Sequence, residues 1–319
     1  MVGVFGRTVR PVLLAAGRSD RLQRRLTRSS LTRRVVRRFV PGDTLDVALN
    51  VVGVLRDSGR YVSIDYLGEN VADARGAAAS VRAYLDLLDA LGQRRDTVYE
   101  GVRPLEVSVK LSALGQALDR DGQKIALDNA RTICERAEQV GVWVTVDAED
   151  HTTTDSTLSI AGDLRVDFDW LGTVVQAYLR RTLADCRELA AVGARVRLCK
   201  GAYDEPASVA YRDRAGITDS YLRCLHVLMA GSGYPMAASH DPAVIGAVGV
   251  TAHELGRGIG DFEYQMLYGI RDEEQRRLVA DGNQVRVYLP FGGQWFGYFM
   301  RRLAERPANL MFFTRALMR

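Results

Sequence analysis

The chain has 319 residues, of which 47% are hydrophobic and 26% are charged, with only 8 prolines. This composition is typical of a globular protein with a large buried core and excludes an intrinsically disordered chain. The four cysteines form no Cys-x-x-Cys pair and the four histidines show no metal-ligand spacing, so we expect free thiols, a reducing cytoplasmic compartment and no dedicated metal site. No apolar stretch reaches the roughly 20 residues that a membrane-spanning helix needs.

The first 40 residues are strongly basic. They contain eleven arginines and one acidic residue, Asp20, a local net charge of +10; subtracted from the total of +4, this leaves −6 for the rest of the chain. Three interpretations stay open: a solvated helical face, which we favour, an arm that attracts anionic lipid or nucleic acid, and an Arg-rich transit peptide. Because Pro41, Gly42 and Asp43 indicate a turn between two helices, we predict a helical arm over residues 1–58 and a catalytic domain over 59–319.

Short runs rich in β-branched residues recur through the rest of the chain, and longer segments with helical spacing separate them. The eight predicted strands are Tyr61–Asp65, Glu106–Lys110, Val142–Asp147, Thr173–Gln176, Arg195–Lys200, Pro235–His240, Asp261–Gln265 and Val285–Leu289. The helical patterns include Ala72–Leu91, Lys124–Gln139, Ala177–Ala191, Ser220–Met229, Glu273–Ala280 and Trp295–Arg306. Eight alternating units predict an α/β fold, a (β/α)8 barrel of parallel strands. An open doubly wound sheet is the alternative, but its Gly-x-Gly-x-x-Gly turn is missing after Asp65.

Polar residues occupy the C-terminal ends of these strands, although unpaired charges inside a barrel are costly. In a barrel of this type those ends form the catalytic face, so side chains that are distant in sequence converge there. Any single residue could be an ordinary loop residue, but the whole set predicts an active site. The set consists of Lys110, Asp147, Glu149, Gln176, Arg197, Lys200, Ser239, His240 and Tyr288.

The lysines are unusually placed. The chain has three lysines beside forty arginines, and two of the three, Lys110 and Lys200, lie at predicted strand ends. Such a lysine could form a Schiff base, as in barrel aldolases, or act as a point charge that holds an anionic group of the substrate.

Two adjacent arginines, Arg301 and Arg302, lie on the last predicted helix. Successive helical residues point about 100° apart, so both can reach one anion only if the helix passes beside the pocket. Two guanidinium groups suit a carboxylate or a phosphate. A solvated helix surface, with Glu305 as an ion-pair partner, is the alternative.

A series of motifs runs through the chain in a fixed order. The motifs are FVPGDTLDVAL (39–49), DYLGE (65–69), VSVKLSALG (107–115), VTVDAED (144–150), VVQAYLRRT (174–182), RLCKGAYDE (197–205), EYQMLYG (263–269), RVYLPFG (286–292) and MRRLAERPAN (300–309). With this series, the chain from about Phe39 onward resembles the proline dehydrogenase family, flavin-dependent enzymes of proline catabolism. The resemblance implies a distorted barrel of the TIM type that carries non-covalent FAD over its C-terminal mouth.

The resemblance also assigns roles to individual residues. It implies that Lys110, Arg301 and Arg302 bind the carboxylate of proline and that Tyr288 and Leu267 pack on its ring. It places Asp147 and Arg197 beside the flavin as the catalytic pair that tunes it. The other implied cofactor contacts are Ala148, Gln176, Lys200, Gly201, Ala202, Ser239 and His240. Finally, it implies a gate formed by an ion pair between Glu69 and Arg301.

The implied reaction is the oxidation of L-proline to 1-pyrroline-5-carboxylate by hydride transfer from C5 of proline to N5 of the flavin. From the resemblance we expect a quinone as electron acceptor, a peripheral membrane contact, a functional link to a separate pyrroline-carboxylate dehydrogenase, and no nucleic-acid partner. Because the chain ends at Arg319, soon after the arginine pair, we expect the monofunctional form. The alternatives are a lysine Schiff-base aldolase and a nucleic-acid or membrane-surface binder that acts through the basic arm.

Overall fold

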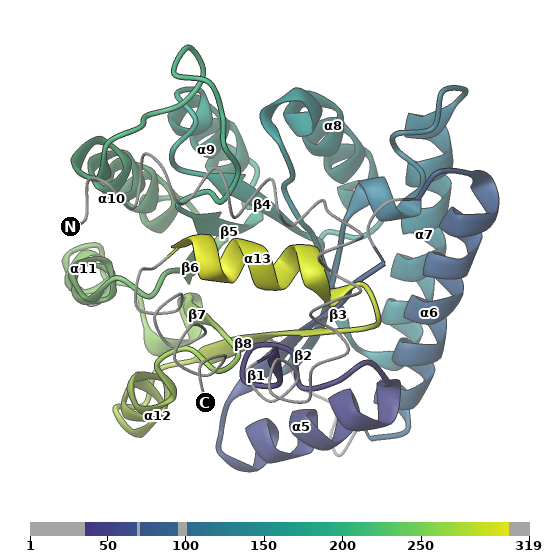
Figure 1. The fold of residues 1–319 in the computed structure, drawn as a ribbon. Helices are drawn as coiled ribbons and strands as arrows, with labels where there is room; N and C mark the ends of the chain where they lie inside the picture. Colours follow the sequence, from purple (N-terminus) through teal and green to yellow (C-terminus); the bar gives the residue numbers. More distant parts are fainter. Residues whose placement is uncertain (1–35, 69–70, 95–100, 306–319) are drawn as a thin grey trace, which may run out of the picture.

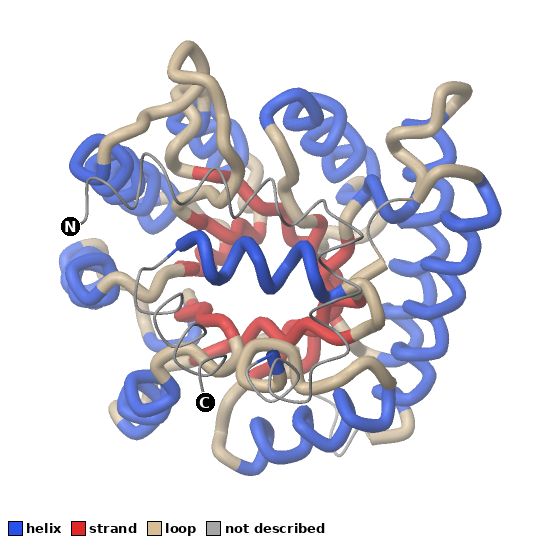
Figure 2. Tube along the Cα trace, in the orientation of Figure 1, coloured by secondary structure: helices blue, strands red, loops and turns tan. Residues whose placement is uncertain are grey.

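The computed structural model describes residues 36–68, 71–94 and 101–305. These residues form a closed barrel of eight parallel strands in sequence order, with β8 pairing to β1. In Figures 1 and 2 the strands form an inner ring and most helices surround it. The strands are β1 (Tyr61–Tyr66), β2 (Leu105–Val109), β3 (Trp143–Val146), β4 (Gly172–Gln176), β5 (Arg195–Cys199), β6 (Tyr234–Ala238), β7 (Glu263–Leu267) and β8 (Val285–Phe291). The helices are α5 (Leu45–Asp57), α6 (Ala74–Gly92), α7 (Gly122–Val140), α8 (Thr154–Arg165), α9 (Thr182–Ala191), α10 (Arg214–Ala230), α11 (Pro242–Glu254), α12 (Asp272–Ala280) and α13 (Trp295–Glu305).

The predicted barrel is confirmed, and all eight predicted strands are present. Strand β7 begins two residues later than predicted, because the Asp261 side chain accepts a hydrogen bond of 2.7 Å from the Gly258 amide and closes a 3-10 turn. Helix α9 begins at Thr182 rather than at Ala177. The intervening residues form turns and do not join the helix, because they pair with the segment after β5, where Arg180 N donates to Val209 O at 2.9 Å and Leu179 bridges to Ala210.

Strand residues alternate between two environments. One set faces the helices and is apolar, as in Val62 and Ile64 of β1 and Val107 and Val109 of β2, all fully buried. Burying a side chain of this size contributes about 1.5–3 kcal/mol. The other set faces the barrel axis and is largely polar, which differs from the branched apolar residues that usually fill such barrels.

Local signals fix where several helices begin and end. Asp73, Asp213 and Asp241 precede α6, α10 and α11, and each side chain accepts a hydrogen bond from an amide in the first turn. Such N-caps contribute about 1 kcal/mol each. Gly141 ends α7 with a φ of 68°, a conformation that favours glycine. These caps set the starting points of α10 and α11 at the cavity described below.

Helix α13 lies across the C-terminal mouth of the barrel instead of joining the outer ring (Figure 1). Its apolar residues Trp295, Phe296 and Phe299 pack against Phe39 and Leu67. This cluster anchors the helix to the segment that precedes α5. Within the described ranges, no helix is both long and apolar enough to cross a membrane.

Most of the predicted arm, residues 1–58, lies outside the described residues. Its last helix, α5, packs Ala48, Leu49, Val52 and Leu55 into the same apolar cluster as β1 and α6. The division of the chain at residue 58 stays a prediction.

Candidate active site

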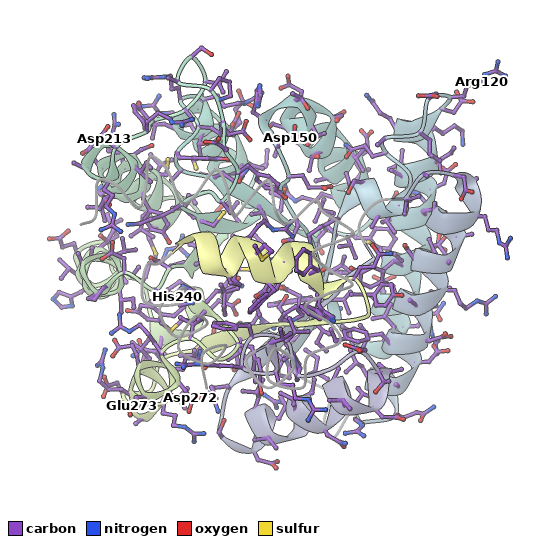
Figure 3. The ribbon with its side chains drawn as sticks, in the orientation of Figure 1. Arg120, Asp150, Asp213, His240, Asp272 and Glu273 are labelled. Atoms are coloured by element: carbon purple, nitrogen blue, oxygen red, sulfur yellow. The ribbon has the colours of Figure 1, made fainter. Side chains whose placement is uncertain are left out.

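A cavity of about 800 Å³ opens at the C-terminal ends of the strands, beneath α13. All of the predicted site residues within the described ranges line it except Glu149. These residues are Lys110, Asp147, Ala148, Gln176, Arg197, Lys200, Gly201, Ala202, Ser239, His240, Leu267, Tyr288, Arg301 and Arg302. Figure 3 shows His240 inside the ring of helices, between β6 and α11, whereas Arg120 lies at the outer edge. A further predicted residue, Glu69, lies outside the described residues, as does its predicted ion pair with Arg301.

Arg197 on β5 forms the floor of the cavity. Its side chain is buried, and all five of its N–H groups donate hydrogen bonds within the protein. The acceptors are Gln265 Oε1 for Nε, Ser108 Oγ and Asp147 Oδ1 for Nη1, and Ser63 Oγ and Glu106 Oε1 for Nη2. These bonds fix the guanidinium in one orientation, so it presents a positive charge to the cavity at a defined place.

Asp147 joins this floor to the wall of the cavity. Its Oδ1 accepts from Arg197 at 2.7 Å, and its Oδ2 accepts from the hydroxyl of Tyr288 at 2.7 Å. Burial raises the pKa of Tyr288 well above its usual value, and the charges of Asp147 and Asp65 raise it further. Tyr288 is therefore a neutral donor, held with its ring at the cavity surface.

Lys110 follows β2 and is also buried. Its Nζ donates to Asp65 Oδ2 at 2.7 Å and lies 3.4 Å from the hydroxyl of Tyr288 and 3.6 Å from Asp147 Oδ2. An ion pair of this kind stabilises the ammonium form, which suits the binding of an anion. A Schiff-base lysine instead needs a neutral amine to attack a carbonyl.

Arg301 and Arg302 reach the same cavity from α13, where both side chains are half-buried. The Cζ atom of Arg302 lies 5.0 Å from the centre of the Tyr298 ring, close enough for a cation–π contact. The helix passes beside the pocket, as the prediction requires. The cavity thus receives cationic groups from its floor, its wall and its roof.

A second region of the cavity lies between β4, β5 and β6 and extends to the first turns of α10 and α11. Lys200 Nζ donates to Asp241 Oδ2 at 2.7 Å and to Thr218 Oγ1 at 3.0 Å. His240 Nε2 accepts from the amide of Leu267 at 2.9 Å. Amides at helix N-termini together with a lysine form a good environment for an anion such as a phosphate.

Gly201 gives a test of how closely this region is packed. Its φ is 108°, and an added Cβ would lie 2.3 Å from the ring of Tyr178. We expect Gly201→Ala to destabilise the protein by about 2 kcal/mol, through backbone strain and this clash. Gly246→Ala on α11, where nothing lies within 4 Å, should be neutral or stabilise by up to about 1 kcal/mol. Urea unfolding measures both variants, and equal effects would show that the loop after β5 is not tightly constrained.

The structure also adds residues that the sequence analysis did not assign to the site. Asp65, Tyr203, Ile217, Thr218 and Tyr298 line the cavity. Asp65 is a polar residue at the C-terminal end of a predicted strand, which is the same pattern that identified the other site residues. Ile217 and Thr218 were missed because α10 starts six residues before the predicted helix. Glu149, in contrast, holds a loop: its carboxylate accepts from Ser112 N at 3.0 Å and from Ser112 Oγ at 2.6 Å.

The closed barrel and its cation-lined cavity are typical of an α/β-barrel enzyme whose active site suits an anionic group of a ligand. Among the described residues, no three His, Cys, Asp or Glu side chains are grouped so that they could hold a metal ion. A model of the family "Proline dehydrogenase" matches residues 48–315. The chain belongs to the proline dehydrogenase family, whose members are generally flavin-dependent.

Individual relatives agree with this assignment. The chain is 39% identical to "Proline dehydrogenase 1" of Bacillus subtilis (strain 168), over 90% of this chain and 92% of the relative. It is 37% identical to "Proline dehydrogenase" of Deinococcus radiodurans, over 88% and 89%. Among solved structures it is similar to proline utilization A (PutA) from Bdellovibrio bacteriovorus inactivated by N-propargylglycine, with a TM-score of 0.80 and 26% identity over 86% of this chain. The chain spans about a third of that PutA chain, 33% of its length.

Proposed function

We propose that the protein oxidises L-proline to 1-pyrroline-5-carboxylate with a bound FAD, the first step of proline catabolism. Membership of the proline dehydrogenase family supports this assignment. The observation that carries it is the convergence of Lys110, Arg301 and Arg302 on one cavity that also contains a buried Asp147–Tyr288 pair. The cationic groups suit a small carboxylate.

The second region of the cavity fits a flavin nucleotide. Lys200 and the first turns of α10 and α11 offer a cation and amides to phosphate groups, while Ser239 and His240 offer polar contacts to the chain between the ring and the phosphates. The Gln176 side chain lines the cavity while its Nε2 donates to Glu149 O at 2.7 Å, which leaves its carbonyl oxygen as an acceptor for ring N–H groups. When bound, the flavin would accept at N5 the hydride that leaves C5 of proline.

The protein's own residues supply orientation and charge. Lys110 and the two arginines of α13 hold the proline carboxylate, while Tyr288 and Leu267 pack against the ring. Arg197 and Asp147 would lie beside the bound flavin and set the electrostatic potential there, because their mutual hydrogen bond holds both charges in place. A strong base is not needed once the proline nitrogen is unprotonated, and His240 Nε2 already accepts the Leu267 amide.

The Schiff-base alternative is not supported. Both lysines at strand ends are paired with carboxylates, Lys110 with Asp65 and Lys200 with Asp241, each at 2.7 Å. A lysine nucleophile would have to leave such a carboxylate before it could attack a carbonyl carbon.

The direct test is a visible absorption spectrum. We expect the purified protein to be yellow and to lose its flavin absorbance when L-proline is added without oxygen. D-proline is the matched control, because it carries the same groups in a mirror-image arrangement, and it should bleach the flavin much more slowly. A flavin-loaded sample that L-proline does not bleach would refute the proposed function.

The proposal extends to the acceptor of the electrons and to the enzyme that uses the product. We propose a membrane quinone as the electron acceptor. The enzyme would be cytoplasmic, and a peripheral membrane contact of the basic segment 1–40 would bring it to the quinone. Because bifunctional PutA proteins of Escherichia coli and Salmonella typhimurium are also relatives, we further propose a functional link to a separate pyrroline-carboxylate dehydrogenase.

A further inference from the structure

The barrel interior beneath the cavity contains a group of buried charged residues. Glu106 on β2 is completely buried and lies between two arginines of β5. Its Oε1 accepts from Arg197 Nη2 and from Ser63 Oγ, the latter at 2.7 Å, and its Oε2 accepts from Arg195 Nη2 at 2.7 Å. A single carboxylate therefore connects the two guanidinium groups.

The two arginines have different surroundings. Arg197 lines the cavity and donates to Asp147 at 2.7 Å. Arg195 points away from it: its Nη1 donates to Trp170 O at 2.7 Å, and its Cζ lies 3.6 Å from the centre of the Trp143 ring. Glu106 therefore links Arg195, at the start of β5, to Arg197 in the floor of the active site.

The carboxylate of Glu106 stays ionised in these surroundings. Burial by itself raises the pKa of Glu106, but Arg286, Arg197 and Arg195 lower it, and the resulting pKa lies well below the usual value. A fixed negative charge thus lies directly behind the positive charge of Arg197. It offsets part of the positive potential that Arg197 would otherwise impose on the cavity.

We propose that Glu106 is a positioning residue for the reaction: it fixes the orientation of Arg197, and through it that of Asp147, and it sets the positive potential at the cavity floor. The proposal rests on the proposed function, because the group that responds to this potential is the bound flavin. Glu106 does not line the cavity, so it acts on the site from behind Arg197, through its hydrogen bond to that guanidinium and through its charge.

Exchanging Glu106 for glutamine removes one negative charge behind Arg197, so the cavity floor becomes more positive. A more positive floor stabilises the reduced flavin, which carries more negative charge than the oxidised form. The midpoint potential of the flavin should therefore rise, by about 30 mV if the reduced form is stabilised tenfold in this two-electron couple.

The experiment compares Glu106→Gln with Glu263→Gln in flavin-loaded protein, using spectroscopic redox titration. Glu263 is a matched control because it is equally buried and pairs with Arg286, but it contacts Arg197 only through Gln265. We expect Glu106→Gln to raise the potential at least twice as much as Glu263→Gln does. Equal shifts, or no shift in Glu106→Gln, would overturn the proposal.

A second variant covers the case in which Glu106→Gln gives no folded protein. Arg195→Gln removes the positive charge on the far side of Glu106 and leaves that carboxylate to act on Arg197. The potential should then fall, and a rise or no change would contradict the proposal. Failure of the flavin-loaded wild-type protein to bleach with L-proline refutes the proposed function. Bleaching of the wild type together with an unaltered potential in the variants refutes only the role of Glu106.

Discussion

Replacing Arg302 with methionine is expected to raise the KM for proline roughly 10- to 150-fold with little change in kcat or in FAD content. A hydrogen bond to a charged group contributes about 1.5–3 kcal/mol, and each 1.4 kcal/mol corresponds to a factor of ten. Methionine keeps an unbranched apolar stem that can pack on Tyr298, so the helix should stay in place while the charge is lost. Because the carboxylate is held equally in the ground state and the transition state, the loss should appear in KM.

The matched control is Arg223→Met on α10. Arg223 pairs at 3.1 Å with Asp219 on an exposed helix face, so its removal subtracts the same charge outside the cavity. Its KM for proline should stay within about twofold of the wild-type value, because Arg223 does not line the cavity. Steady-state kinetics with a dye acceptor, together with the flavin-to-protein absorbance ratio, measure both variants. An unchanged KM in Arg302→Met would mean that Arg302 does not bind the carboxylate of proline.

The location of the active site could be predicted because the barrel imposes a simple rule. Strands are short and periodic, and their C-terminal ends must meet at one face. Lys110, Asp147 and Lys200 could therefore be grouped from sequence although they are separated by up to 90 positions. The pairing within that group could not be predicted, because it depends on how the strands close around the axis.

The charged interior shows this limit most clearly. Ser63, Glu106 and Arg197 come from β1, β2 and β5, and their contacts exist only after the barrel has closed. In sequence they look like isolated polar residues within short strands, where apolar residues would normally be expected. The start of α9 was wrong for a related reason: the residues before Thr182 pair with the loop after β5, a contact that helical periodicity does not reveal.

The same closure makes the barrel interior sensitive to loss of a charge, and Arg286→Met should be strongly destabilising. Arg286 on β8 is fully buried, and it donates to Glu263 through Nε at 2.7 Å and through Nη2 at 2.9 Å. The same Nη2 also donates to Arg103 O at 2.9 Å. Removing one partner of a buried ion pair typically costs about 3–5 kcal/mol, because the remaining charge stays buried without compensation. For a domain of this size the Tm should fall by roughly 10 °C.

A double variant separates this explanation from a simple packing defect. If the loss in Arg286→Met arises from the charge left on Glu263, then Arg286→Met combined with Glu263→Leu should recover most of the stability, since apolar replacements of both partners are often neutral. A packing defect would instead make the double variant less stable than the single one. Lys124→Ala, which breaks an exposed pair with Asp128 on α7, is the control and should cost less than about 0.5 kcal/mol. Denaturant unfolding monitored by tryptophan fluorescence gives all three free energies, and recovery in the double variant would show that the polar barrel interior is stable only as a set of complementary charges.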